Sequence, residues 1–366
     1  MKVAIVHDYI KEYGGAERVL ESLHRVFPNA PVFTTVFLPK YLGPHKSRFE
    51  NWNVRTSWVQ YLPFKSKLIS PIRLIAPFLF KSFDFSDYDI VIVSATGAYS
   101  PNLIKKKSAK QISYVHTPPR YLYGYETARD WKNNAISRFL GLILIHILRI
   151  YDYKSSQNVD YFIANSNETK RRIEKFYRRD SKVIYPPVNN PKSFSQETRD
   201  YFLTGGRMAR AKHTDLVLET FAKNRLPLKI FGRGFAGFEE ELREKYEKFT
   251  NIEFVGEVED DEKFCLMEGA KAFIFASKDE DFGITPVEAM MVGTPVISHR
   301  SGGPIETIIE GKTGIFFNQF TVDNLQNAIK QFEKMKFDNS EISKYAQKFN
   351  RQRFEREIKE FVEKHA

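Results

Sequence analysis

The sequence Ser277-Lys-Asp-Glu-Asp-Phe-Gly-Ile-Thr-Pro-Val-Glu-Ala-Met290 follows a short apolar run, Ala272-Phe-Ile-Phe-Ala276. Such a run is typical of a strand buried in a parallel sheet. Thr285, Pro286 and Glu288 then have the spacing of a helix start, with a cap, a proline at the first helical position and an acid three residues past the cap. The stretch predicts a strand, a turn and a helix, which are the building unit of α/β folds.

The turn between this strand and this helix predicts a binding site for an anion. Backbone N–H groups at a helix N-terminus have no acceptor inside the helix and readily bind phosphate. Glu280 and Glu288 add two carboxylates, which suit the hydroxyl groups of a sugar. The pattern favours a nucleotide sugar as ligand. The alternative leaves Glu288 as half of a capping box and Glu280 as a solvated loop carboxylate.

Short apolar runs alternate with helical patterns along the whole chain. This alternation predicts parallel sheets covered by helices on both faces, an α/β fold of two doubly wound, Rossmann-like domains. In the first half the expected strands are 3–7, 32–37, 90–95, 111–116, 161–166 and 183–185. In the second half they are 201–204, 228–231, 252–255, 272–276, 295–298 and 314–317.

A proline- and asparagine-rich segment, Tyr185-Pro-Pro-Val-Asn-Asn-Pro191, has no apolar period and marks the expected domain boundary. We therefore expect an N-terminal domain over residues 1–188 and a C-terminal domain over residues 189–348. The tail, residues 349–366, has the pattern of a charged helix with one apolar face. That face contains Phe354, Ile358, Phe361 and Val362, and by its pattern alone it suits either domain.

The positive charge lies in the first half of this 366-residue chain. Residues 1–188 contain 29 Lys and Arg against 15 Asp and Glu, whereas the remainder contains 27 against 30. This asymmetry predicts an anionic partner for the first half, such as a membrane surface, an acidic substrate or nucleic acid. The segment 64–81 has four cations, no acid and many large apolar residues, which suits contact with anionic lipid. The alternative is a buried hairpin that covers the first domain.

Cysteine content and the chain's start bear on its compartment. Cys265 is the single cysteine, which excludes an internal disulfide and fits a reducing compartment. Its apolar neighbours predict a buried, inert thiol. We expect no signal peptide, because the sequence opens with the strand-like residues 2–7, and the longest apolar stretch, 139–148, is about half the length that spans a bilayer. We expect a cytoplasmic protein.

Candidate binding residues lie where strands end, which is where ligands bind in doubly wound sheets. Because they recur at such ends in both halves, we expect them to line one cleft between the domains. Glycine turns at these places often serve conformation alone. The candidates are Gly14, Gly15, His116, the residues 205–207, 232–234 and 301–303, and Glu280.

Four groups of residues also have simpler explanations than a role in binding. Arg207 and Lys212 suit the neutralisation of a diphosphate, and the alternative is a solvated basic loop. His116 precedes two prolines that stiffen its turn, and the alternative is a structural hydrogen bond. Asp279 and Asp281 imitate an Asp-x-Asp metal site, but no neighbouring group completes it, so we expect no metal. The cations at 105–110, 170–172 and 178–179 are expected on the solvated surface; as a set they also offer contacts for lipid headgroups.

The Glu-x7-Glu spacing of Glu280 and Glu288, followed by Gly293-Thr-Pro-Val-Ile297, resembles the signature of the retaining glycosyltransferases of family 4. The resemblance covers most of the chain, and its segments stand in the family's order. They are 14–18, 115–121, 164–166, 184–188, 206–212 and 301–303. The segment Val115-His-Thr-Pro-Pro-Arg-Tyr121 is most similar to bacterial mannosyltransferases that build O-antigen and other surface polysaccharides.

The resemblance implies a GT-B fold whose second domain holds the donor and whose C-terminal helix returns to the first domain. It implies that Glu288 binds the ribose, that Glu280 and His116 face the donor sugar, and that no metal or other cofactor is needed. The remaining implied donor contacts are Gly14 and Gly15 in the first loop, Arg207 and Lys212 at the diphosphate, Glu257 near the base, and the backbone of Phe282, Gly283 and Ile284.

The implied reaction moves mannose from GDP-mannose to a polyprenyl-diphosphate-linked glycan at the inner face of the cytoplasmic membrane. The basic first half then meets the anionic membrane surface, and nucleic acid is not a partner. A UDP-sugar is the alternative donor. From other classes, the alternatives are a nucleotide-sugar-binding module without turnover and a nucleotide-sugar epimerase.

Overall fold

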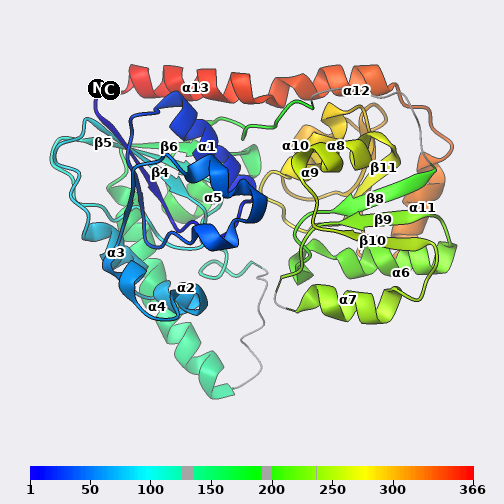
Figure 1. Cartoon of the computed structure of the whole chain (residues 1–366), viewed down its shortest axis with the longest axis horizontal. Helices are drawn as coiled ribbons and strands as arrows, with labels where there is room; N and C mark the ends of the chain where they lie inside the picture. The colour runs from blue at the N-terminus through cyan, green and yellow to red at the C-terminus, as the bar shows by residue number, and fades with distance from the viewer. Residues whose placement is uncertain (126–134, 192–199, 236) are drawn as a thin grey trace. The chain divides into compact units, whose positions relative to one another are not determined.

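The computed structural model describes residues 1–125, 135–191, 200–235 and 237–366, with the backbone alone for residues 135–140. The chain divides into two compact units (Figure 1). The first contains Met1–Tyr125, the described residues up to Pro187, and Arg351–Ala366. The second contains the described residues of Val188–Asn350.

The first unit is built on a seven-stranded sheet in which every described pair of strands is parallel, in the order β3-β2-β1-β4-β5-β6-β7. The strands are β1 (Val3–His7), β2 (Val32–Thr34), β3 (Val54–Thr56), β4 (Ile90–Ala95), β5 (Lys110–Val115), β6 (Tyr161–Ala164) and β7 (Lys182–Val183). The helices are α1 (Gly15–Val26), α2 (Lys65–Ile72), α3 (Ala76–Lys81), α4 (Ala135–Gln157), α5 (Asn167–Tyr177) and α13 (Arg351–Lys364).

The second unit has a six-stranded parallel sheet in the order β10-β9-β8-β11-β12-β13. The strands are β8 (Tyr201–Gly205), β9 (Leu228–Phe231), β10 (Ile252–Gly256), β11 (Ala270–Phe275), β12 (Val296–His299) and β13 (Gly314–Phe317). The helices are α6 (Thr214–Asn224), α7 (Phe238–Tyr246), α8 (Asp260–Glu268), α9 (Ile284–Met291), α10 (Pro304–Thr307), α11 (Val322–Phe332) and α12 (Asn339–Ala346). The predicted α/β class with two doubly wound parallel sheets is confirmed.

The cores follow from the strand patterns. All five residues of β1 are buried, because β1 lies inside the sheet between β2 and β4. In the first unit α13 packs beside α1, and Phe354, Ile358 and Val362 enter the core that contains Val19 and Leu23 of α1 (Figure 1). Their spacing of four residues gives α13 one apolar stripe. In the second unit α6 and α11 pack against each other on the strand core.

Three local expectations were wrong. The edge strand β3 was missed, because Val54-Arg-Thr56 is partly exposed and has no apolar run. Cys265 is exposed rather than buried, because α8 turns Leu266 and Met267 inward and Cys265 outward. Arg172 is 2% exposed instead of solvated, since it lies on the inner face of α5.

The segment 64–81 is neither a regular interfacial helix nor a fully buried hairpin. It forms the short helices α2 and α3. Ile72, Leu79 and Phe80 enter the core, while Phe64 and Phe78 are exposed. In the described part of the chain, no helix combines the length and apolarity needed to cross a membrane.

Candidate active site

Glu280 lies in the loop after β11, where it pairs with Lys212. The Lys212 ammonium donates to Glu280 Oε2, and Ser277 Oγ donates to the same oxygen over 2.5 Å. The side chains of Lys212 and Glu280 are 34% and 16% exposed, so the pair remains accessible to a ligand. Lys212 belongs to the loop after β8, the strand that pairs with β11. The parallel sheet thus brings together two predicted site residues that are far apart in sequence.

The helix α9 begins directly after Gly283, the last residue of this loop. Gly283 caps it with φ of 85°, a left-handed conformation that favours glycine, and Ile284 is the first helical residue. The predicted cap at Thr285 was therefore wrong, and so was the capping-box role of Glu288, which lies in the second turn. The N–H groups of the first turn have no acceptor inside the helix, as an anion site requires.

Glu288 is buried in an ion pair with α8. Lys263 Nζ lies 2.6 Å from Glu288 Oε1 and 3.1 Å from Asp260 Oδ1. Burial of a lone carboxylate is unfavourable, so the ammonium makes this position possible for Glu288. Lys263 was not singled out from the sequence, because a lysine in the charged start of α8 looks like an ordinary surface residue.

Three glycines join the ends of β8, β9 and β10. Gly232 donates its N–H to the Gly256 carbonyl over 2.7 Å, and Gly206 donates to the Phe231 carbonyl over 3.1 Å. A Cβ on Gly232 would lie 1.9 Å from the Gly206 carbonyl oxygen. Arg207 follows Gly206 and is exposed, with its guanidinium 5.7 Å from the Phe235 ring centre. Glu257 follows Gly256, at the end of the edge strand, and is exposed.

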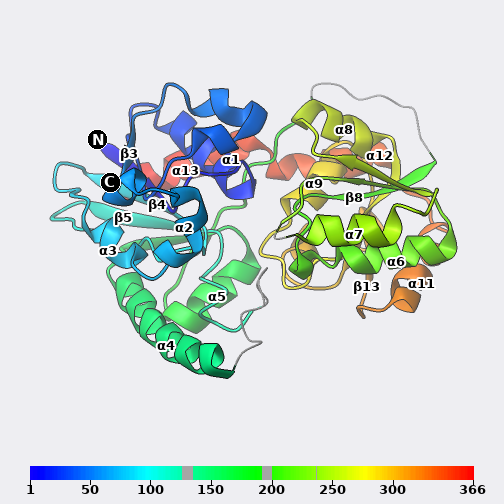
Figure 2. The ribbon, with the colours of Figure 1, turned by 60° about the horizontal axis from the view of Figure 1, so that its bottom comes forward.

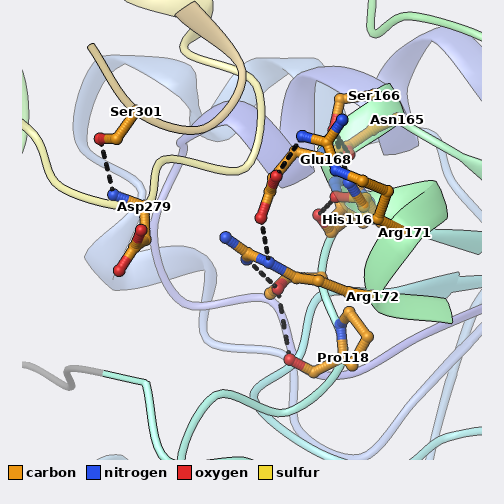
Figure 3. Close-up of polar contacts among 11 residues, drawn as sticks. His116, Pro118, Asn165, Ser166, Glu168, Arg171, Arg172, Asp279 and Ser301 are labelled. Carbon is orange, nitrogen blue, oxygen red and sulfur yellow. Dashed lines mark hydrogen bonds and ion pairs between the residues drawn. The ribbon is translucent and has the colours of Figure 1, made fainter. Parts of the chain in front are cut away.

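The 301–303 turn is packed against the Glu280 loop. Gly303 donates to the Glu280 carbonyl over 2.8 Å. Ser301 Oγ accepts from the Asp279 N–H over 3.1 Å (Figure 3). Phe282 is buried against Phe349, with ring centres 5.7 Å apart. The loop that leads to the predicted residues 282–284 is therefore held by the 301–303 turn and by Phe349.

In the first unit His116 directly follows β5 and belongs to a buried polar chain. Its Nε2 is 3.0 Å from Ser94 Oγ, which is 3.1 Å from Nδ1 of His7. Burial, with a smaller contribution from nearby His7, lowers the pKa of His116 to about 3. The ring is therefore neutral at neutral pH and offers one donor and one acceptor nitrogen. His7 and Ser94 were missed because they are internal to strand-like runs.

The Gly14–Gly15 turn begins α1. Gly14 donates its N–H to Glu17 Oε2 over 2.9 Å, and Gly15 is the first helical residue. Glu17 Oε1 also lies 3.7 Å from His7 Nε2. The first loop and the His116 ring are thus linked through one group of buried side chains within the first unit.

A second polar network supports the turn after His116 (Figure 3). Arg172 donates to Glu168 Oε1 over 3.0 Å and to Thr117 Oγ1 over 3.2 Å. Glu168 also accepts from Arg171 over 2.6 Å. Asp8, buried after β1, accepts from Thr96 Oγ1 over 2.5 Å, and burial raises the pKa of its carboxyl. These contacts hold the loops after β1, β4 and β5 in fixed positions.

The described residues contain no group of three or more His, Cys, Asp or Glu side chains that would hold a metal ion. Asp279 has φ of 50°, a strained conformation for a residue other than glycine. Its backbone N–H is bound by Ser301. Asp279 thus serves the shape of the loop.

Two doubly wound parallel sheets, with acidic, basic and glycine-rich loops at the carboxyl ends of their strands, are the architecture of the GT-B class of glycosyltransferases. Two family models match the chain, Glycosyltransferase Family 4 over residues 13–190 and Glycosyl transferases group 1 over residues 187–349. The chain belongs to glycosyltransferase family 4 and is a glycosyltransferase.

Among curated proteins the chain is similar to alpha-1,3/1,6-mannosyltransferases named ALG2. The Dictyostelium discoideum protein is 24% identical over 303 residues, which are 70% of this chain and 69% of the relative. The Mus musculus protein is 24% identical over 265 residues, 62% of this chain and 61% of the relative. The Rhizomucor pusillus protein is 24% identical and is covered over 59% of its length.

Solved structures support the fold. The lipopolysaccharide outer core galactosyltransferase WaaB has a TM-score of 0.68 at 16% identity, with 100% of both chains covered. Anabaena HepE in complex with UDP has a TM-score of 0.70 at 16% identity, again with 100% of both chains covered. Sucrose-phosphate synthase from Thermosynechococcus elongatus has a TM-score of 0.72 at 16% identity, over 100% of this chain and 99% of that one.

Proposed function

We propose that this glycosyltransferase transfers mannose from GDP-mannose, with retention of configuration, to a polyprenyl-diphosphate-linked glycan. The reaction would serve the synthesis of a bacterial surface polysaccharide such as O-antigen, at the inner face of the cytoplasmic membrane. The observation that carries the assignment is the accessible pair of Lys212 and Glu280 beside the N-terminus of α9. A cation, a carboxylate and a helix N-terminus at one place suit a ligand that is part diphosphate and part sugar.

Each predicted residue has a role in this proposal. Lys212 and Arg207 neutralise the diphosphate together with the N-terminus of α9. Glu280 binds hydroxyl groups of the sugar, and Glu288, held by Lys263, binds the ribose. The remaining contacts are the backbone of Phe282, Gly283 and Ile284 at the sugar and phosphate, Gly14 and Gly15 at the phosphates, His116 at the sugar, and Glu257 near the base.

The chemistry needs a stabilised leaving group. The bond between the anomeric carbon and the diphosphate oxygen breaks, and the electron pair leaves with the diphosphate. Lys212, Arg207 and the helix N-terminus stabilise that negative charge without a metal ion. The acceptor hydroxyl then attacks the same face of the sugar, and its proton passes to the departing phosphate oxygen. Neutral His116 can accept or donate a hydrogen bond at the sugar without adding charge.

Different observations support the identity of the donor sugar and the identity of the donor base. The ALG2 relatives are named mannosyltransferases, which favours mannose. The HepE structures contain UDP or UDP-glucose, so a UDP-sugar is the second candidate donor. Glu257, the residue proposed to lie near the base, is exposed, and a single exposed carboxylate does not select guanine by itself.

A panel of nucleotide sugars tests the donor. A ligand that binds only the folded state raises the melting temperature, by an amount that grows with its affinity. We expect GDP-mannose to raise it most, and GDP alone to raise it less. If a UDP-sugar raised the melting temperature more than GDP-mannose, that UDP-sugar would be the donor. If no nucleotide sugar of the panel raised it, the proposed donor site would be wrong.

Turnover and stereochemistry are tested separately. NMR of the product from a lipid-diphosphate acceptor should show the donor's own anomeric configuration. Binding without transfer, equal in the parent and in Glu280→Ala, would favour a binding module. Epimerised free donor would favour an epimerase, and inverted product would contradict retention.

A further inference from the structure

The helix α4 presents apolar side chains on its exposed face. Among its described side chains, Leu142 is 56% exposed and Ile143 is 48% exposed, although both are large and apolar. The other large exposed residues of α4 are Leu144, Ile147, Ile150, Tyr151 and Tyr153. Single exposed apolar residues are ordinary, but a continuous row of this kind marks an interaction surface.

The inner face of the second half of α4 is largely polar, although Leu148 is also buried there. Asp152, Ser155 and Ser156 are buried there. Asp152 accepts from Tyr123 Oη over 2.8 Å, and Arg149 holds the Leu122 carbonyl over 2.9 Å. These polar contacts fix the rotation of α4 about its axis. The helix therefore cannot turn its apolar residues toward the core without losing buried hydrogen bonds.

The apolar surface continues onto α3. The rings of Phe78 and Tyr151 are 5.6 Å apart and meet edge to face, so α3 lies against α4 (Figures 1 and 2). Phe78 is 53% exposed in spite of this contact. Two further large apolar residues, Leu74 and Ile75, are exposed immediately before α3. We give the name α3–α4 face to these exposed residues, which are Leu74, Ile75 and Phe78 together with Leu142, Ile143, Leu144, Ile147, Ile150 and Tyr151 of α4.

Apart from the buried Asp152, the charged residues that α2, α3 and α4 contribute have one sign. No Asp or Glu occurs in the sequence between Glu50 and Asp84, and the one acid of α4, Asp152, is buried. The cations of α2, α3 and the end of α4 are Lys65, Lys67, Lys81 and Lys154, with Arg73 between the first two helices. Large apolar residues flanked by cations are the composition of segments that lie in the headgroup layer of anionic lipid.

We propose that the α3–α4 face docks this protein on an anionic lipid bilayer, with the apolar flank of α4 at the boundary between headgroups and acyl chains. The proposal rests on the proposed function, because a polyprenyl-linked acceptor resides in such a bilayer. A second copy of the chain fits this face less well. Self-association through it would bring two cationic surfaces together. The lipid headgroups instead neutralise them.

Vesicle binding tests the proposal. Full-length protein is sedimented with vesicles of phosphatidylglycerol and phosphatidylcholine, and with vesicles of phosphatidylcholine alone. We expect binding to the anionic vesicles only. The triple variant Ile143→Ser, Ile147→Ser and Ile150→Ser should reduce that binding at least tenfold. A second variant, Lys65→Glu with Lys67→Glu, should reduce binding most at low salt.

The matched control is Ile305→Ser with Ile309→Ser, two exposed isoleucines of the second unit. It should bind vesicles as the parent does. Equal binding by the triple variant and this control would overturn the proposal, as would a parent that does not bind anionic vesicles. Light scattering tests whether a second copy of the chain occupies this face instead. If the parent is a dimer that the triple variant converts to monomers, and vesicle binding is unchanged, the face belongs to a second copy.

Vesicle binding and donor binding can be lost independently of each other. The triple variant should keep the melting shift with GDP-mannose, because its substitutions lie outside the donor loops. Vesicle binding without any nucleotide-sugar shift would leave the docking surface in place and remove the proposed donor. A normal melting shift with GDP-mannose, together with no binding to vesicles, would keep the proposed donor and remove the docking surface.

Discussion

Lys263 Nζ lies 2.6 Å from Glu288 Oε1, and both side chains are almost completely buried. A carboxylate in this position is fixed before any ligand arrives, since its partner comes from α8 and not from the loop itself. Asp260 holds the same ammonium over 3.1 Å. The second glutamate of the Glu-x7-Glu pair is therefore a rigid acceptor, whereas Glu280 lies on a loop and remains partly exposed.

Removal of the Lys263 side chain should lower the free energy of unfolding. Lys263→Met leaves the Glu288 carboxylate buried without its cation, and breaking such a pair typically costs about 3–5 kcal/mol of unfolding free energy. Urea denaturation at pH 7.5 measures the change. The double variant Lys263→Met, Glu288→Leu replaces the pair by apolar groups and should recover most of this stability. Donor affinity should stay low in the double variant; if it returned to the parent's value, Glu288 would not bind the ribose.

Lys212 should act on donor affinity and hardly on stability. Its pair with Glu280 is partly exposed, and such pairs contribute about 0–1 kcal/mol to folding. A charge-assisted hydrogen bond to a phosphate is worth about 1.5–3 kcal/mol, so Lys212→Ala should weaken binding by roughly 10- to 150-fold in calorimetry. Arg207→Ala should add to the loss. Lys223→Ala, which breaks the exposed pair with Glu219, is the control and should change neither quantity.

The sequence predicted the strands best where a buried parallel strand needs a continuous apolar run. Ile90–Ala95 and Leu228–Phe231 were predicted to the residue. It also predicted that Glu280 and the 206–212 loop would follow strand ends, because the binding loops of a doubly wound sheet lie beyond the carboxyl ends of its strands. The structure adds that β8 and β11 are neighbours, which is why Lys212 reaches Glu280.

Other features depend on contacts that no local pattern records. Gly283 takes the cap position because the loop needs a positive φ there, although Thr285 is the better cap by residue type. Arg172 stands in a basic run yet is buried, since Glu168 and Thr117 satisfy its guanidinium. The partners of His116 come from β4 and β1, whose order in the sheet is a tertiary fact.

His116 should make stability depend on pH. Burial lowers its pKa from 6.5 to about 3, so below pH 6.5 the unfolded chain binds the proton first. The stability that neutral His116 supplies is complete above pH 6.5 and is lost as the pH falls toward 3, at about 1.4 kcal/mol per pH unit. The stability difference between the parent and His116→Asn should therefore shrink by about that amount between pH 5.5 and 4.5.

Urea titrations at both pH values measure this difference, and the comparison with His116→Asn removes the contribution of Asp8 and other carboxyls that titrate nearby. NMR gives an independent check, because the ring protons of His116 should show no titration between pH 8 and 5. A titration near pH 6.5 would show that the ring is charged at neutral pH, and the neutral role at the sugar would fail.

Gly302→Ala should damage the donor loop through a collision. A Cβ at this position would lie 2.1 Å from the Glu280 carbonyl oxygen, on a backbone with φ of 63°. The backbone strain alone costs about 1–2 kcal/mol. Gly311→Ala has a similar φ of 78°, but its Cβ would meet nothing closer than Met335 Cε at 3.9 Å, so it isolates that strain. Because the Glu280 loop must move in Gly302→Ala, donor affinity should fall at least tenfold in this variant and stay unchanged in Gly311→Ala. Equal melting shifts with GDP-mannose in the two variants would show that the position of the Glu280 backbone does not matter for donor binding.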